Sequence, residues 1–204
     1  LKAGKLVLTP YARDTKMTFI QHFLPGQALE ENAHTSVGIQ SAWYKDRWTV
    51  GADFEVTEGE LREYQPNPTT GSDFLVATIP AGEHYNYQVD ANTQALFARY
   101  QWPLTEATKL TAGARWERVQ YDYDNLMLTG RTRDDGTACA RGGCRFNRPA
   151  DRQDTFSNLS PQLGLTHLIT AEQQLYANLS RGFRAPQTSE LYRLQGGQEV
   201  TDID

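Results

Sequence analysis

The chain has 204 residues, of which 22% are charged, and a formal net charge of −5 at pH 7. It contains no apolar run of the roughly eighteen residues that a transmembrane helix needs. The negative charge argues against a nucleic-acid partner, because phosphates attract a basic surface. A chain of this length can form one large all-β domain.

Eight strands are predicted along the chain, at residues 5–12, 15–24, 35–44, 47–56, 88–102, 107–122, 154–170 and 173–181. The connections between them alternate in length: 13–14, 45–46, 103–106 and 171–172 are short, whereas 25–34, 57–87 and 123–153 are long. In an antiparallel up-and-down sheet every second connection lies on the same rim. One rim is therefore predicted to carry tight turns and the other long loops, which is typical of a transmembrane β-barrel.

Several predicted strands alternate between an apolar and a polar face. In segment 47–56 the apolar parity consists of Trp48, Val50, Ala52, Phe54 and Val56. The same alternation recurs in 35–44, 95–102, 110–117 and 162–169, and it is the period of a β-strand. If the apolar face meets lipid, the opposite parity must face a polar lumen; it carries Asp53, Glu55, Arg99, Arg115 and Glu117. A soluble sandwich also alternates, but its loops rarely exceed about 15 residues.

The four tryptophans are predicted to lie at two heights of the sheet. Trp43, Trp48 and Trp102 are beside short connections, and Trp116 follows the connection 103–106 after about ten residues, the height of a tilted strand crossing a bilayer. This placement predicts two belts of interfacial aromatic side chains. Packing in a protein core is the alternative explanation for the same spacing.

The two cysteines, Cys139 and Cys144, lie in the glycine-rich sequence CARGGC. Two cysteines within one loop favour a local disulfide in an oxidising compartment, and two free thiols are the alternative. A metal site is disfavoured, because none of the four histidines is nearby in the sequence.

The sequence offers no recognisable set of catalytic residues. The histidines are scattered, and neither a GxSxG nucleophile motif nor a paired-carboxylate motif is present. We therefore expect no enzyme and no cofactor.

Segment 179–198 reads LSRGFRAPQTSELYRLQGGQ. It resembles a signature stretch in the barrels of TonB-dependent outer-membrane receptors, with the motif residues Gly182, Phe183, Arg184, Ala185, Pro186, Glu190, Leu191 and Tyr192. Segments 22–41, 110–117 and 156–170 resemble the same family, so the resemblance spans nearly the whole chain.

The resemblance implies a fold and a location. Family members import scarce nutrients, chiefly ferric siderophores, haem and cobalamin, through a 22-stranded barrel that is plugged by an N-terminal domain. Residues 1–204 are then an all-β antiparallel meander of about eight strands, an incomplete section of such a barrel in a Gram-negative outer membrane. The chain begins at Leu1 without Met and stops at Asp204 in a polar stretch, so we expect an internal piece without the plug domain and the C-terminal strands.

The resemblance also implies partners: outer-membrane lipid and lipopolysaccharide, an iron–siderophore or similar ligand, and the TonB complex, reached through an N-terminal region. Segment 123–153 contains the arginines Arg131, Arg133, Arg141, Arg145, Arg148 and Arg152, which are candidates for capturing an anionic ferric siderophore. A solvated loop, or one paired with lipopolysaccharide phosphates, is the alternative. Haem is another candidate ligand, although neither a ligating histidine nor an NPNL box follows in 187–204.

Two other readings of the fold remain open at this point. A complete eight-stranded barrel with a structural or adhesive role would pair segment 5–12 with segment 173–181. A soluble carbohydrate-binding β-sandwich would cover the face of Trp43, Val50 and Phe54 with a second sheet.

Overall fold

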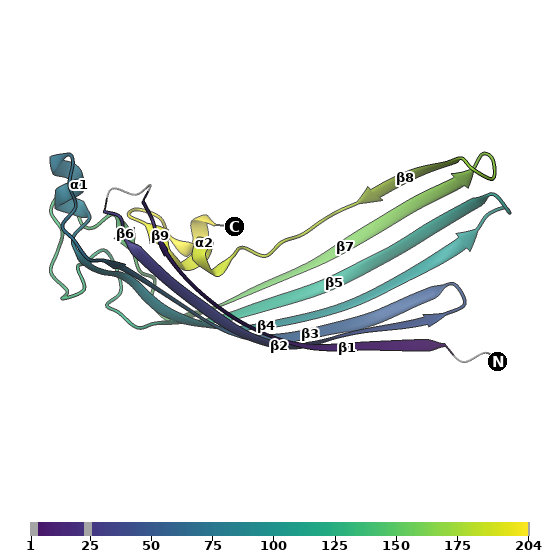
Figure 1. Cartoon of the computed structure of the whole chain (residues 1–204), viewed down its shortest axis with the longest axis horizontal. Coiled ribbons are helices and arrows are strands. Elements are labelled where there is room, and N and C mark those ends of the chain that lie inside the picture. Colours follow the sequence, from purple (N-terminus) through teal and green to yellow (C-terminus); the bar gives the residue numbers. More distant parts are fainter. Residues whose placement is uncertain (1–3, 23–25, 204) are drawn as a thin grey trace.

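The computed structural model describes residues 4–22 and 26–203. Seven strands form one antiparallel sheet in the order β1-β2-β3-β4-β5-β7-β8 (Figure 1). Their bounds are Lys5–Ile20 for β1, Leu29–Lys45 for β2, Trp48–Gln65 for β3, Gly82–Pro103 for β4, Thr108–Asn125 for β5, Arg152–Leu168 for β7 and Gln174–Ser180 for β8. The strands of this sheet follow one another in chain order, with only the short strand β6 left out between β5 and β7, so the predicted all-β meander is confirmed.

The smaller elements lie in the connections and after β8. They are the helix α1 (Asp73–Thr78), the strand β6 (Phe146–Asn147), the helix α2 (Thr188–Tyr192), the strand β9 (Leu194–Gln195) and the short helix η1 (Val200–Asp202). β6 and β9 pair with each other as a separate two-stranded sheet. In the described part of the chain, no helix is long and apolar enough to cross a membrane.

The two rims of the sheet differ as predicted. Short connections of residues 46–47, 104–107 and 169–173 lie at one end of the strands. Residues 26–28 and the connections 66–81 and 126–151 lie at the other end (Figure 1). The tightest turn places Asp46 at φ 52°, a left-handed conformation that Asp adopts more readily than most residues. We call the second end the long-loop rim.

The first predicted hairpin is wrong. Residues 13–14 form no turn, because Arg13 and Asp14 pair with Ser36 and Thr35 in the middle of the continuous strand β1. Strand β2 extends further toward its N-terminus than predicted, so it offers a partner to every residue of β1. The sheet therefore has seven strands instead of eight. Residues 23–24 of the predicted strand 15–24 lie outside the described residues.

The long connections are shorter and more ordered than predicted. Residues 57–65 continue β3 and residues 82–87 belong to β4, so only 66–81 connect these strands. The connection 126–151 contains β6 and two isolated bridges, Gly130 with Arg148 and Thr132 with Ala138. The apolar side changes near the long-loop rim: the outer positions Glu58, Glu60 and Arg62 are polar, while Leu61 and Tyr87 are buried on the inner face. A single period-two pattern therefore does not continue through the whole strand.

One face of the sheet carries an exposed apolar band, and we call it the outer face. Val50 is opposite Trp43 and Leu110 is opposite Leu165 on this face. Its leucines are exposed: Leu8, Leu96 and Leu159 have 54%, 57% and 56% of their surface accessible. In the described part of the chain no second sheet covers this face, and β1 does not pair with β8. Neither the sandwich nor the closed eight-stranded barrel is therefore formed.

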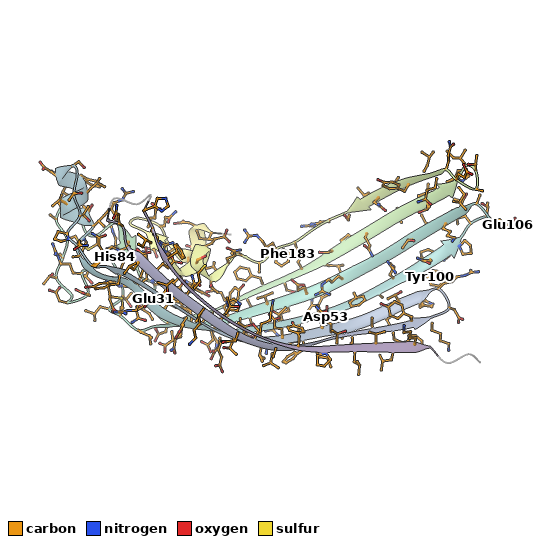
Figure 2. The ribbon with its side chains drawn as sticks, viewed as in Figure 1. Glu31, Asp53, His84, Tyr100, Glu106 and Phe183 are labelled. Atoms are coloured by element: carbon orange, nitrogen blue, oxygen red, sulfur yellow. A yellow bond between two sulfur atoms is a disulfide. The ribbon has the colours of Figure 1, made fainter. Side chains whose placement is uncertain are left out.

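The opposite, inner face is charged at the height of the apolar band. Arg115 contacts Asp53 at 2.6 Å and Glu117 at 2.9 Å, and Arg13 pairs with Glu55. Figure 2 shows Asp53 in the middle of the sheet and His84 toward the long-loop rim. Charged pairs on one face and exposed leucines on the other are the division that a barrel wall between a polar lumen and lipid requires.

Candidate ligand-binding site at the long-loop rim

Residues 181–203, which we call the return segment, run back from β8 toward the long-loop rim (Figure 1). They pack on the inner face through Tyr192, which has no exposed surface. Its ring stacks on Tyr123 with centroids 4.2 Å apart and meets Tyr87 edge-on at 6.2 Å. The Tyr192 hydroxyl donates to Asp154 Oδ2 at 2.8 Å, and burial together with this bond raises the Tyr192 pKa. Leu191, also buried, belongs to the same apolar cluster.

The motif residues explain how the return segment turns. Arg184 donates to both carboxylate oxygens of Glu190, at 2.9 and 3.0 Å. The same carboxylate accepts from the Gln187 backbone N–H at 2.7 Å and so caps α2. The Pro186 carbonyl accepts from the Tyr121 hydroxyl at 3.2 Å, which ties the turn to β5. Phe183, by contrast, stays 39% exposed (Figure 2).

Four ionisable side chains gather where the return segment meets the wall. Glu30 and Glu63 are directly opposite each other on β2 and β3, and each is at most 5% exposed. Arg193 Nη1 lies 3.1 Å from Glu30 Oε2, and its Nε donates to Glu63 Oε2 at 2.7 Å. His84 Nδ1 lies 3.0 Å from Glu63 Oε1. Gln21 bonds to Glu30 and accepts from Arg193 Nη2 at 2.6 Å.

A guanidinium and hydrogen bonds compensate the two buried carboxylates. His84 Nε2 is 2.8 Å from the Pro80 carbonyl, so the ring is held between this carbonyl and the Glu63 carboxylate. Burial raises a carboxyl pKa, but the hydrogen bond from His84 and the charge of Arg193 hold the Glu63 pKa below its ordinary value. Burial lowers a guanidinium pKa, but Glu63 and Glu30 raise the pKa of Arg193. The guanidinium of Arg193 and the hydrogen bond from His84 thus stabilise the two buried carboxylates.

A cavity of about 350 Å³ opens beside this cluster. The wall, the return segment and the connection 126–151 all contribute to it. Its lining includes Glu63, Gln65, His84, Tyr85, Arg145, Phe146, Glu190 and Arg193. His84 stacks on Phe146 with ring centroids 4.5 Å apart. Across residues 4–22 and 26–203, no group of three or more His, Cys, Asp and Glu side chains is placed to hold a metal ion.

The six arginines of segment 123–153 do not converge on one point. Arg148 is buried and donates to the carbonyls of Leu128, His84 and Thr132 at 2.7, 3.1 and 2.6 Å. Such internal contacts make it a structural residue of the rim.

The other five arginines differ in their surroundings. Arg152 pairs with Asp154 at 2.7 Å, and Arg131 donates to the Cys144 carbonyl at 3.0 Å. Arg145 lines the cavity and lies 6.0 Å from the Phe74 ring centroid. Arg133 is half-buried and Arg141 is exposed. Ligand capture therefore stays a prediction, and Arg145 is the member best placed for it.

Cys139 and Cys144 are joined by a disulfide bond, and both are buried. The Cys144 backbone N–H donates to the Arg131 carbonyl at 3.0 Å. Directly after the disulfide, β6 pairs with β9 of the return segment. The disulfide thus fixes the part of the connection on which the return segment rests.

The tryptophans occupy two heights on the outer face. Trp48 and Trp102 both contact Tyr100 near the short turns, with ring centroids 4.6 and 4.5 Å apart, and Trp43 is in the same region, close to Lys45. Trp116 donates to Ser157 at 2.9 Å. The next outward-facing residue on its strand is charged, so Trp116 ends the apolar band there. The interfacial role remains a prediction.

Sequence reasoning missed the charged cluster itself. Glu63 and His84 fall within the predicted loop 57–87, and Glu30 within the predicted loop 25–34. Arg193 lies inside the recognised segment 179–198, but nothing in the motif shows which acid it meets. Only the register of β2 against β3 brings the two carboxylates together.

Comparisons with known proteins agree with this geometry. The sequence profile of the family described as "TonB dependent receptor-like, beta-barrel" matches residues 8–202. A similar solved structure is "Copper transporter OprC", with 17% sequence identity and a TM-score of 0.57 over 92% of this chain. The match covers 28% of that transporter, so the chain spans less than a third of its length. No curated protein matches the sequence. The chain belongs to the TonB-dependent receptor β-barrel family and is part of a barrel in the Gram-negative outer membrane.

Proposed function

We propose that the full-length protein imports a scarce nutrient across the outer membrane with TonB-derived energy, and that its cargo is a ferric siderophore. Residues 1–204 form part of one barrel domain, and the plug domain and remaining strands belong to other parts of the parent protein. Family membership supports transport. The cavity at the long-loop rim supports the cargo class.

The observation that carries the cargo proposal is the composition of this cavity. Long loops of such barrels face the cell exterior, where cargo arrives. Tyr85 and Phe146 supply aromatic surface, while Arg145 supplies a guanidinium group. Guanidinium groups pair with the negatively charged oxygens of a ferric chelate, and aromatic rings pack against its organic arms. Arg145 has no carboxylate among its contacts in the described residues, so its charge is free for cargo.

Copper is a second candidate cargo, because a protein of similar fold is named a copper transporter. A copper ion, unlike a ferric chelate, has no organic arms for the aromatic side of the cavity. An uptake experiment separates the two directly.

The test is uptake by cells that express the full-length receptor. Radioactive iron is supplied as catecholate, hydroxamate and hydroxycarboxylate chelates, and copper is supplied in parallel. We expect uptake of one ferric chelate, and its loss in a strain without TonB. Uptake of copper alone, or uptake that persists without TonB, would contradict the proposal.

A variant pair connects the uptake to the cavity. Arg145→Ala removes the unpaired guanidinium and should weaken chelate binding about tenfold, the cost of one charge-assisted hydrogen bond. Arg141→Ala is the control, because Arg141 is an exposed arginine of the same connection that does not line the cavity. Equal chelate binding by both variants would show that the guanidinium in the cavity does not bind the chelate.

A further inference from the structure

The carboxylates of Glu30 and Glu63 need a cation. They are directly opposite on neighbouring strands, where like charges repel, and both are nearly buried. Two buried negative charges without compensation are costly, because water cannot solvate them. In the described residues, Arg193 and the imidazole of His84 are the basic groups within salt-bridge distance of these carboxylates.

These two basic side chains are held differently. His84 belongs to β4 and is fixed between Glu63 and Pro80, so it stays with the wall. Arg193 belongs to the return segment and follows α2 directly. When the return segment leaves the inner face, Arg193 leaves with it. The imidazole of His84 then remains as the one basic group beside the two carboxylates in the described chain.

Arg193 therefore binds the two carboxylates in the way that a separate basic ligand would bind them. Its guanidinium bonds to both carboxylates and to the Gln21 side chain, and it lies 6.0 Å from the Tyr85 ring centroid. Carboxylates, an amide oxygen and an aromatic face are the groups that bind guanidinium and ammonium ions in proteins. The cavity adjoins this point and is lined by both Glu63 and Arg193.

We propose that Glu30 and Glu63 form a binding site for a guanidinium or primary ammonium group, which Arg193 fills while the return segment is docked. The return segment moves off the wall when a basic group of the cargo replaces Arg193. Because the return segment lines part of the cavity, this exchange would enlarge the cavity as the cargo enters. This proposal rests on the proposed function and adds that the imported chelate carries a basic group.

Chemical rescue tests the site in the full-length receptor in membranes. Spin labels at Thr201 in the return segment and at Gln88 on β4 report the docked position, and both residues are exposed. Cys139 and Cys144 are bonded to each other and do not react with the label. We expect one narrow distance in the unsubstituted receptor, and its loss in Arg193→Ala. Ethylguanidinium should restore the narrow distance of Arg193→Ala in a saturable manner, whereas the neutral ethylurea should not.

Two further variants make the result decisive. Arg193→Lys keeps a cation and should retain the narrow distance. Arg193→Ala combined with Glu30→Gln and Glu63→Gln removes the need for a cation, and it should dock without any addition. A narrow distance in Arg193→Ala alone, equal rescue by ethylurea, or an undocked triple variant would each overturn the inference. None of these measurements uses cargo, so their failure leaves the uptake experiment unaffected.

Discussion

Three carboxylates stand side by side on the outer face, between the apolar band and the long-loop rim. Glu58 is opposite Asp90, and Asp90 is opposite Asp122. All three are exposed, so solvent screens much of their repulsion. Gln153 donates to Asp122 at 3.0 Å and relieves one end of the row. Asp90, with an acid on each side, is the least favourable position.

Removing the central charge should therefore stabilise the sheet. We expect Asp90→Asn to increase the free energy of unfolding by about 0.2–1 kcal/mol, the usual size of a cross-strand effect. Thermal unfolding of the full-length receptor at low salt measures it, and about 1 M salt should abolish the difference. Gln88→Glu is the matched opposite, because Gln88 lies between Glu60 and Asp124 in the same arrangement. A gain for both variants, or for neither, would show that repulsion is not the cause.

At the scale of elements, we expect the docking of the return segment to depend on pH. The Glu63 pKa is lowered, so Glu63 contributes stability that is complete above its ordinary pKa of 4.5. This stability is lost as the pH falls through the lowered pKa, because a protonated Glu63 no longer attracts Arg193. We expect the return segment to loosen in acid below pH 4.5, measured as faster hydrogen exchange at Leu191 and Leu194. Glu63→Gln should flatten the profile; an unchanged acid profile in that variant would assign the effect to another group.

The strands show what could be predicted from the sequence. Where one face meets lipid and the other meets charge, as in 48–56, alternation locates the strand. Beyond Val56 the outward positions are Glu58, Glu60 and Arg62, so the strand continues without any hydrophobic period. Backbone hydrogen bonds to β2 and β4 keep residues 57–65 in the strand. The residue pattern of one strand does not show such pairing.

The candidate site, like the strands, can be predicted from the sequence only in part. The motif at 182–192 marks the return segment only through the family resemblance, although its helix cap and turn are local contacts. The contact between Arg193 and Glu30 spans most of the chain and depends on the register of three separate segments. Residue spacing carries no information on such a contact.

At the scale of the whole molecule, the described sheet has two edge strands and one exposed apolar face. β1 and β8 each pair on one side within the described chain. Unpaired backbone groups are not tolerated in hydrocarbon, so further strands of the parent barrel must pair with both edges. On the outer face, the apolar band then marks the part of each strand that lies in the hydrocarbon. The polar residues between this band and the long-loop rim mark the part outside it.

A pair of variants on β2 tests this membrane position. Ile39 is in the apolar band, opposite Phe54, while Thr35 is on the same face beyond Val37, opposite Asp14 and Glu58. Arginine near the middle of a bilayer costs about 2–4 kcal/mol on a barrel surface, and about 0–1 kcal/mol near the interface. We expect Ile39→Arg to lower the denaturant midpoint of the receptor in lipid vesicles strongly. Thr35→Arg should leave it nearly unchanged, because the new charge meets water and two acids. If the two variants lost stability equally, Ile39 would not face hydrocarbon, and the outer face would need another partner.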